Sequence, residues 1–391
     1  MPDPTLILNA TAAAGIVAAV VMLLLGVWPA RKAAAGPPEA PLRRSPFATL
    51  AEVLAVGGGM GIGCWWLGVL PKLPPVEDQD RLLLVLLPAT GIVEILAVVL
   101  QRRPWFGRIL RLLLALPIPF LLLFGSGWIP STWTPGGDPS APSTWTPQEA
   151  QRNLLGLGVL LAAVWGLLIW AAQRAGGFVV PAAIGLISAA AGVTIMLSGY
   201  ASGGMTGLPF ASVAAGVLLV CLLFARRHSM TGLVGVGTVL LFGLLMAGRF
   251  FGELTTTNFA LLIAAPVLCG LIALPPVRNL KPPVRFIVVL VACLLPAAAA
   301  VGLAHHSFAA ETEESSAYSA ASSDSDAPAF NAGPSQSQSA RPSAAADSEP
   351  AAASSSPRDP GADEPSSPGN TDKTGSPDKK RPLTDPGEEP K

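Results

Sequence analysis

The chain has 391 residues, of which 51% are hydrophobic and 13% charged, and its mean hydropathy is +0.53. A soluble globular domain carries about 25% charged residues, so this composition indicates an integral membrane protein rather than a soluble domain. The formal net charge is zero. Residues 305–391 hold 7 of the 25 basic and 15 of the 25 acidic residues, which leaves 18 and 10 for a basic body over residues 1–304.

Ten apolar stretches follow one another along this body, and a helix that spans a membrane needs about 20 mostly apolar residues. They cover residues 6–28, 48–70, 82–100, 109–128, 147–172, 177–200, 208–224, 230–248, 259–274 and 286–304. Nothing basic precedes the first stretch and Arg31-Lys32 follow it, which favours a retained anchor over a signal peptide. The sequence therefore predicts an all-α, polytopic bundle of about ten transmembrane helices.

The loops between these stretches alternate between basic and nearly charge-free. One set contains thirteen basic residues, and the alternate set contains four. The first set is Arg31, Lys32, Arg43, Arg44, Arg102, Arg103, Arg108, Arg174, Arg226, Arg227, Arg278, Lys281 and Arg285; the second is Lys72, Arg81, Arg152 and Arg249. Because basic loops stay in the cytoplasm, the alternation predicts a multi-pass protein of the plasma membrane, the inner membrane in bacteria, with both termini outside the cytoplasm.

The fifth stretch has its own start signal. Thr146, Pro147 and Glu149 match an N-cap, a proline at the first helical position and the acidic member of a capping box. The loop before it repeats Ser-Thr-Trp-Thr-Pro at residues 131–135 and 143–147. A short tandem duplication explains this repeat, and a recognition loop with paired tryptophans is the alternative.

From His305 the composition changes to Ser, Ala, Pro, Asp and Glu. Such a segment cannot bury enough apolar surface to offset its ordering entropy. We expect residues 305–391 to form a disordered tail. It would act as a solvated spacer or contact a cell-envelope or protein partner.

Ionisable residues inside membrane helices are costly and are therefore candidates for function. Glu94 lies in the third stretch, Arg111 just inside the fourth, and Glu52 near the end of the second. Glu94 and Arg111 are nearly equidistant from the turn at Arg102-Arg103, so a helical hairpin places them at one depth. We expect them to pair, with Glu52 as the competing partner for Arg111. Glu94 would serve either a structural ion pair or proton or cation coupling, and Glu52 would otherwise snorkel to the interface.

Pro88 and Pro266 interrupt the third and ninth stretches and predict helix kinks. Each is preceded by an acidic residue outside the membrane and followed by a glycine and a basic loop. The second to fourth stretches thereby resemble the eighth to tenth, and a parallel internal repeat is one explanation of that likeness. Glycines between residues 57 and 63 have the small-xxx-small spacing of close helix packing.

No constellation of residues indicates catalysis, a cofactor or a metal site. The four cysteines lie in apolar stretches without C-x-x-C spacing, and the run Glu77-Asp78-Gln79-Asp80 lacks the glycine and terminal glutamate of a calcium loop. We expect the lipid bilayer as the main partner and no nucleic acid, and the sequence identifies no small-molecule substrate. A transporter or permease with a central cavity at Glu94 is one hypothesis, and a solidly packed, non-transporting scaffold or assembly partner is the other.

Overall fold

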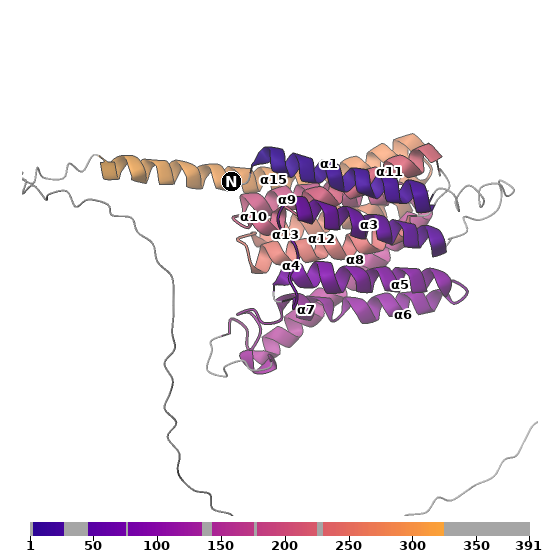
Figure 1. The fold of residues 1–391 in the computed structure, drawn as a ribbon, viewed down its shortest axis with the longest axis horizontal. Helices are drawn as coiled ribbons and strands as arrows, with labels where there is room; N and C mark the ends of the chain where they lie inside the picture. The colour runs from indigo at the N-terminus through magenta and orange to yellow at the C-terminus, as the bar shows by residue number, and fades with distance from the viewer. Residues whose placement is uncertain are drawn as a thin grey trace, which may run out of the picture. The chain divides into compact units, whose positions relative to one another are not determined.

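The computed structural model describes residues 3–26, 46–75, 77–134, 143–175, 178–224 and 230–323. Every regular element in these ranges is a helix, and the helices belong to one compact unit, Met1–Asp326. They lie side by side as an all-α membrane bundle (Figure 1). The expected tail beyond residue 323 lies outside the described residues.

Nine helical segments of the described ranges are long and apolar enough to cross a membrane, and each matches one predicted stretch. They are α1 (Pro4–Val21) with η1 (Met22–Gly26), α3 (Pro46–Trp66), α4 (Asp78–Arg81) with η2 (Leu82–Leu86) and α5 (Leu87–Val99), α6 (Pro104–Ala115) with α7 (Ile118–Leu123), α8 (Pro147–Ala175), α9 (Val179–Leu197), α10 (Ala201–Gly204) with α11 (Gly207–Phe224), α12 (Thr231–Phe250) and α15 (Pro282–Ser323).

The remaining predicted stretch is a two-part helix. It consists of α13 (Thr256–Val267) and the 3₁₀ segment η4 (Leu268–Ala273), and the short α14 (Pro275–Arg278) follows it. A 3₁₀ helix rises about 2.0 Å per residue, against 1.5 Å for an α-helix. Twelve α-helical and six 3₁₀ residues therefore reach about 30 Å, the thickness of the hydrocarbon core. The stretched end compensates for the short length of this segment.

The two prolines expected to kink helices sit where the hydrogen-bond pattern changes. Pro88 follows the π-helical segment η2, in which the Leu87 N–H reaches back to the Leu82 carbonyl. Because a proline ring collides with the carbonyl four residues earlier, a wider turn accommodates Pro88. Pro266 lies in α13 just before the 3₁₀ segment η4.

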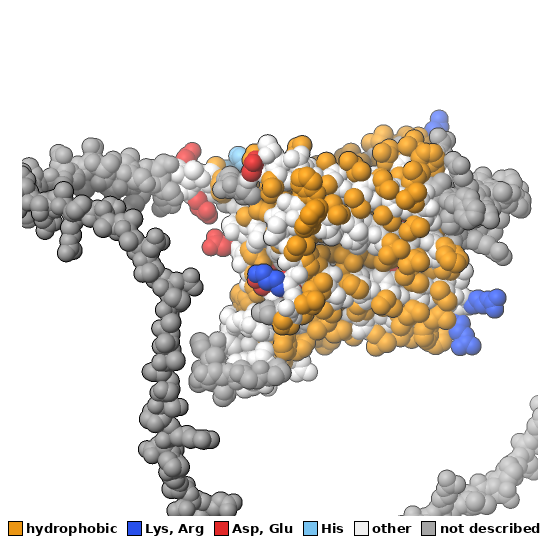
Figure 2. Space-filling view, in the orientation of Figure 1, with side chains coloured by type: hydrophobic (Ala, Val, Ile, Leu, Met, Phe, Trp, Pro, Cys, Tyr) orange, Lys and Arg blue, Asp and Glu red, His pale blue; other side chains and the backbone are white. Residues whose placement is uncertain are grey.

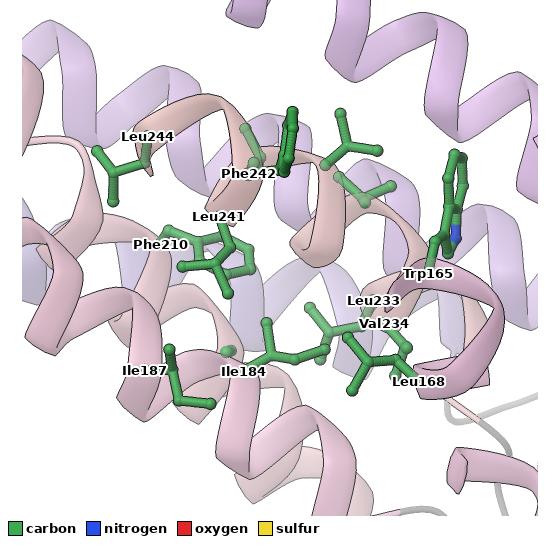
Figure 3. Packing of buried hydrophobic residues seen from close by; sticks show 14 of the residues in the cluster. Trp165, Leu168, Ile184, Ile187, Phe210, Leu233, Val234, Leu241, Phe242 and Leu244 are labelled. Carbon is green, nitrogen blue, oxygen red and sulfur yellow. The ribbon is translucent and has the colours of Figure 1, made fainter. Parts of the chain in front are cut away.

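The helix α12 forms the axis of the bundle and is buried along its whole hydrophobic length. Its neighbours include α3, α5, α8 and α9. Around it, Trp165 and Leu168 of α8 and Ile184 and Ile187 of α9 fill the core (Figure 3). A helix that is apolar all round and touches no lipid is suited to this place.

The small residues of α3 permit close packing, as their spacing predicts. A Cβ atom added at Gly59 would lie 2.8 Å from the Ala14 carbonyl oxygen of α1, and one at Gly63 would lie 2.8 Å from Pro209 of α11. Such approaches need glycine. They hold α1, α3 and α11 together at one edge of the bundle.

The surface of the bundle has an apolar middle and two charged ends. Figure 2 shows hydrophobic side chains over the middle of this face, with Lys and Arg mainly at one end and Asp and Glu at the other. We call the end at the α5–α6 turn, with Arg102 and Arg103, the basic end. The opposite end, with Glu77 before α4 and Glu253 before α13, is the acidic end. The N-terminal end of α1 and the C-terminal part of α15 both lie at the acidic end (Figure 1).

The predicted end of the last helix is wrong, because α15 runs past Ala304 to Ser323. Residues 305–323 contain six Ser, five Ala and three Glu, and Ala and Glu are good helix formers. A spanning helix already provides the nucleus, so each further residue adds a hydrogen bond at little cost. The boundary between helix and tail therefore lies beyond the boundary of the apolar stretch.

The two helix triplets that resemble each other in sequence pack differently. The helix α12 is buried all round, whereas α3 leaves Phe47, Leu54 and Trp65 exposed. The helix α5 packs on α12, α6 and α3, whereas α13 packs chiefly on α15. This arrangement argues against an internal duplication and favours chance similarity between apolar segments.

Candidate functional site

Three helices bring Glu94, Arg111 and Trp165 together beside α12. Arg111 of α6 donates from Nε to Glu94 Oε1 at 2.8 Å and from Nη2 to Oε2 at 2.6 Å. Trp165 of α8 donates from Nε1 to Glu94 Oε1 at 3.0 Å. The expected contact between Glu94 and Arg111 is thus present, in the bidentate form that gives the strongest carboxylate pairs.

The central helix makes room for this pair with a glycine. Glu94 is fully buried, and a Cβ atom added at Gly235 of α12 would overlap its carboxylate. An unpaired carboxylate at this depth would cost several kcal/mol or take up a proton. Arg111, Trp165 and the space at Gly235 together accommodate the Glu94 side chain inside the bundle.

Glu52 has a different partner from the one expected. Its Oε2 accepts a hydrogen bond of 2.9 Å from the Leu233 N–H in the first turn of α12. A Cβ atom at Gly232 would lie 2.8 Å from the same oxygen. The side chain is fully buried, so both the competition for Arg111 and the snorkelling position are wrong. Glu52 instead caps one of the free N–H groups that open a helix.

A pocket of about 420 Å³ opens at the acidic end. Its wall carries charged groups from α4 and the residue before it, hydroxyl groups and three aromatic rings. The lining residues are Glu77, Asp78, Arg81, Phe124, Gly125, Ser126, Tyr200, Ser202 and Phe251. Its volume falls in the usual range for small-molecule sites, about 300–1,000 Å³.

Asp78 and Tyr200 form the polar centre of this pocket. The Tyr200 hydroxyl donates to Asp78 Oδ1 at 3.2 Å and lies 3.4 Å from Oδ2. Gly199 has a φ of +83°, a conformation that glycine adopts without strain, and it turns the chain out of α9 to place Tyr200. Burial, and then the negative charge of Asp78, raise the pKa of the Tyr200 hydroxyl. Tyr200 therefore keeps its proton and remains a donor.

Arg81 lines the pocket and donates hydrogen bonds to carbonyl groups at the C-terminal end of α7. Its guanidinium donates to the carbonyl oxygens of Phe124 and Leu121, and it stacks 5.5 Å from the centre of the Phe124 ring. These carbonyls end a helix and have no acceptor role within it. A cation at a helix C-terminus also meets the negative end of the helix dipole.

The two aspartates of the acidic run 77–80 have different roles. Asp78 faces the pocket, whereas Asp80 Oδ1 accepts a hydrogen bond of 3.0 Å from the Lys72 N–H and fixes the preceding loop.

The two tryptophans of the repeat, Trp133 and Trp145, are both partly buried against the core. Trp145 contacts Trp128 and Phe250, with ring centres 5.5 Å apart in both pairs, and Trp128 Nε1 donates to the Phe250 carbonyl at 2.7 Å. This cluster holds the loop on the end of α12. Residues 135–142, the last residue of the first repeat and the segment that joins the two, lie outside the described residues.

Sequence reasoning found the ion pair but missed the pocket. Asp78, Phe124 and Tyr200 are far apart in the chain, and only the turn after α9 and the break after α7 bring them together. Trp165 was missed because nothing in the sequence of α8 shows which face meets α5. Comparison of the sequence with protein-family models finds no matching family, and comparison with curated proteins finds no match.

Proposed function

We propose that this multi-pass membrane protein is a transporter-like protein that receives a small, positively charged or zwitterionic solute in the pocket at its acidic end. The observation that carries the proposal is the pocket itself, with Asp78 on its wall. The carboxylate would meet an ammonium group of the solute, and the hydroxyl groups of Tyr200 and Ser202 would orient it. Phe124 and Phe251 would cover apolar parts of the solute.

The charge pattern of the loops supports an extracytoplasmic position for the pocket. The basic end would face the cytoplasm, so the solute would enter from outside. Glu94 is not among the residues that line this pocket; it is fully buried, with Arg111 and Trp165 as its hydrogen-bond partners. Transport would need a rearrangement of the α4–α5 helix at the π-helical segment η2, which separates Asp78 in the pocket from Glu94 in α5. Such segments are frequent at functional sites.

Binding can be measured on the full chain in lipid nanodiscs by its melting temperature. Putrescine, choline, lysine and glucose form a panel of two cations, a cationic amino acid and a neutral sugar. We expect a cationic compound to raise the melting temperature of the protein, and glucose to leave it unchanged. Asp78→Asn should abolish the increase. Glu253→Gln, which removes an exposed carboxylate from the same end, is the control and should retain it.

Uptake of the compound that binds, in radiolabelled form, into proteoliposomes then tests transport. Uptake that is saturable and lost in Asp78→Asn would support the proposal. The absence of any shift across the cationic compounds would refute the ligand class.

A non-transporting scaffold is the second candidate, because the axis α12 is buried all round and Glu94 is fully paired. These are properties of a rigid core. Binding without uptake, under conditions where a known transporter is active in the same vesicles, would favour this role.

A further inference from the structure

A second, smaller cavity lies among the helices and is lined by unpaired polar side chains. Its volume is about 20 Å³. Gln79 of α4, Ser188 of α9 and Thr206 between α10 and α11 contribute the polar part of its wall, and Phe210, Leu240 and Leu241 are among its apolar lining. Gln79 follows Asp78 directly, so this cavity and the larger pocket share the first turn of the same helix.

Two of these polar groups lack a partner within the protein. Gln79 Nε2 and Ser188 Oγ are both buried without a hydrogen bond, and their residues are 7% and 1% exposed. An unpaired buried polar group costs free energy comparable to a lost hydrogen bond. Two such groups on one cavity wall require a common explanation.

Ser188 differs from three threonines of the bundle helices. Thr90, Thr194 and Thr238 each donate to the carbonyl oxygen four residues earlier, at 2.6 to 2.8 Å. This bond is the usual solution for a hydroxyl inside a helix. Ser188 makes no such bond, and its oxygen lies on the cavity wall.

We infer that this cavity binds one ordered water molecule. A cavity needs about 10–15 Å³ to hold a water, and a buried water makes about three hydrogen bonds. Gln79 Nε2 would donate to the water, and Ser188 Oγ would exchange a hydrogen bond with it. Thr206 already donates to the Gly203 carbonyl at 2.9 Å, so its oxygen is the third partner, as an acceptor.

The water adds a second link between these parts of the bundle, beside the hydrogen bond from Tyr200 to Asp78. It ties the first turn of the α4–α5 helix to α9 and to the α10–α11 junction, against the side of α12. The inference does not depend on transport or on solute binding in the larger pocket.

Substitution of the polar side chains should change the melting temperature in opposite directions for a bound water and for an empty cavity. If the water is bound, Ser188→Ala and Gln79→Met each remove one of its partners, and we expect each to lower the melting temperature by about 2–4 °C. If the cavity is dry, each substitution removes an unsatisfied polar group and should raise it. Thr231→Val is the matched control, because the Thr231 hydroxyl is also buried and unpaired but lines neither cavity.

A cryo-electron microscopy map of the full chain in nanodiscs gives the direct test. A density peak within hydrogen-bonding distance of Gln79 and Ser188, lost in Ser188→Ala, would support the inference. No peak in a map that shows other buried waters, or a higher melting temperature in both variants, would overturn it.

Discussion

At the scale of single residues, the environment of Glu94 leads to the most specific predictions about stability. It is a fully buried carboxylate with three hydrogen bonds, two of them from one guanidinium. A buried ion pair contributes little net stability, but removing one member leaves the other charge unpaired. The pair is therefore expected to behave as a unit.

We expect Glu94→Gln and Arg111→Gln each to lower the free energy of unfolding by about 3–5 kcal/mol. The double variant should recover a large part of the loss, because no isolated charge remains. Arg108→Gln, which removes an exposed arginine of the same helix, should change stability little. Reversible unfolding in mixed micelles measures all four. Additive losses in the double variant would contradict a structural pair. Intact stability in Glu94→Gln together with loss of a proton- or ion-dependent activity would show a functional role.

Gly235 is the second residue with a sharp expectation. Alanine at this position would overlap the Glu94 carboxylate, and overpacking of a core typically costs about 1–3 kcal/mol. Gly166→Ala is the matched control, since nothing lies within 4 Å of the added Cβ atom there. It should stabilise its helix by about 0.5–1 kcal/mol, because glycine is the poorer helix former. Equal effects of the two substitutions would show that α12 does not approach Glu94 as described.

At the scale of elements, helix ends follow local chemistry that the sequence displays. The helix α8 begins at Pro147 as predicted, and the Thr146 N–H and hydroxyl both contact Glu149 Oε2, at 3.0 and 2.9 Å. The rotation of a helix about its own axis cannot be read from the sequence in the same way. Glu52 faces α12 and not Arg111, since its direction depends on which neighbours surround α3.

The contact between η4 and α15 can be tested through two cysteines. Cys269 and Cys293 are fully buried, and their sulfur atoms lie 3.5 Å apart. The membrane-permeant oxidant diamide, which accepts two electrons and two protons, should join these thiols in a disulfide. Mass spectrometry of the digested protein should recover the linked peptides. Cys64 and Cys221, on α3 and α11, should remain reduced, and a product that joins either of them to Cys269 would contradict the packing.

At the scale of the whole molecule, the alternation of basic and uncharged loops makes a prediction about orientation. Reporter fusions after Arg174 should give a cytoplasmic signal, and fusions at the C-terminus should give an extracytoplasmic one. The reason is the excess of basic residues in one set of short loops. A cytoplasmic signal from the C-terminal fusion would reverse the predicted orientation in the membrane and would place the pocket on the cytoplasmic side.

The sequence predicts the spans and the depth of Glu94 and Arg111, because hydropathy and residue spacing act along the chain. It does not predict the pocket, because Asp78 and Tyr200 meet only through packing between distant helices. It also sets the end of α15 too early, because apolarity marks the membrane boundary whereas Ala and Glu continue a helix in water. Hydrophobic pattern thus locates helices in the membrane, and side-chain fit determines how they turn toward one another.

The buried axis α12 has a consequence for the order in which the molecule is made. Its neighbours α3, α5, α8 and α9 all precede it in the chain, so the surrounding wall is synthesised before the helix that fills it. Until Thr231 and the residues after it enter the membrane, Glu52 has no Leu233 N–H to bind, and the Gly235 surface is missing beside Glu94. At this stage the nascent chain lacks its central helix, and the helices that will surround α12 carry Glu52 and Glu94 without their contacts to it. We therefore expect the chain to be most sensitive to quality-control proteases just before the eighth span enters the membrane.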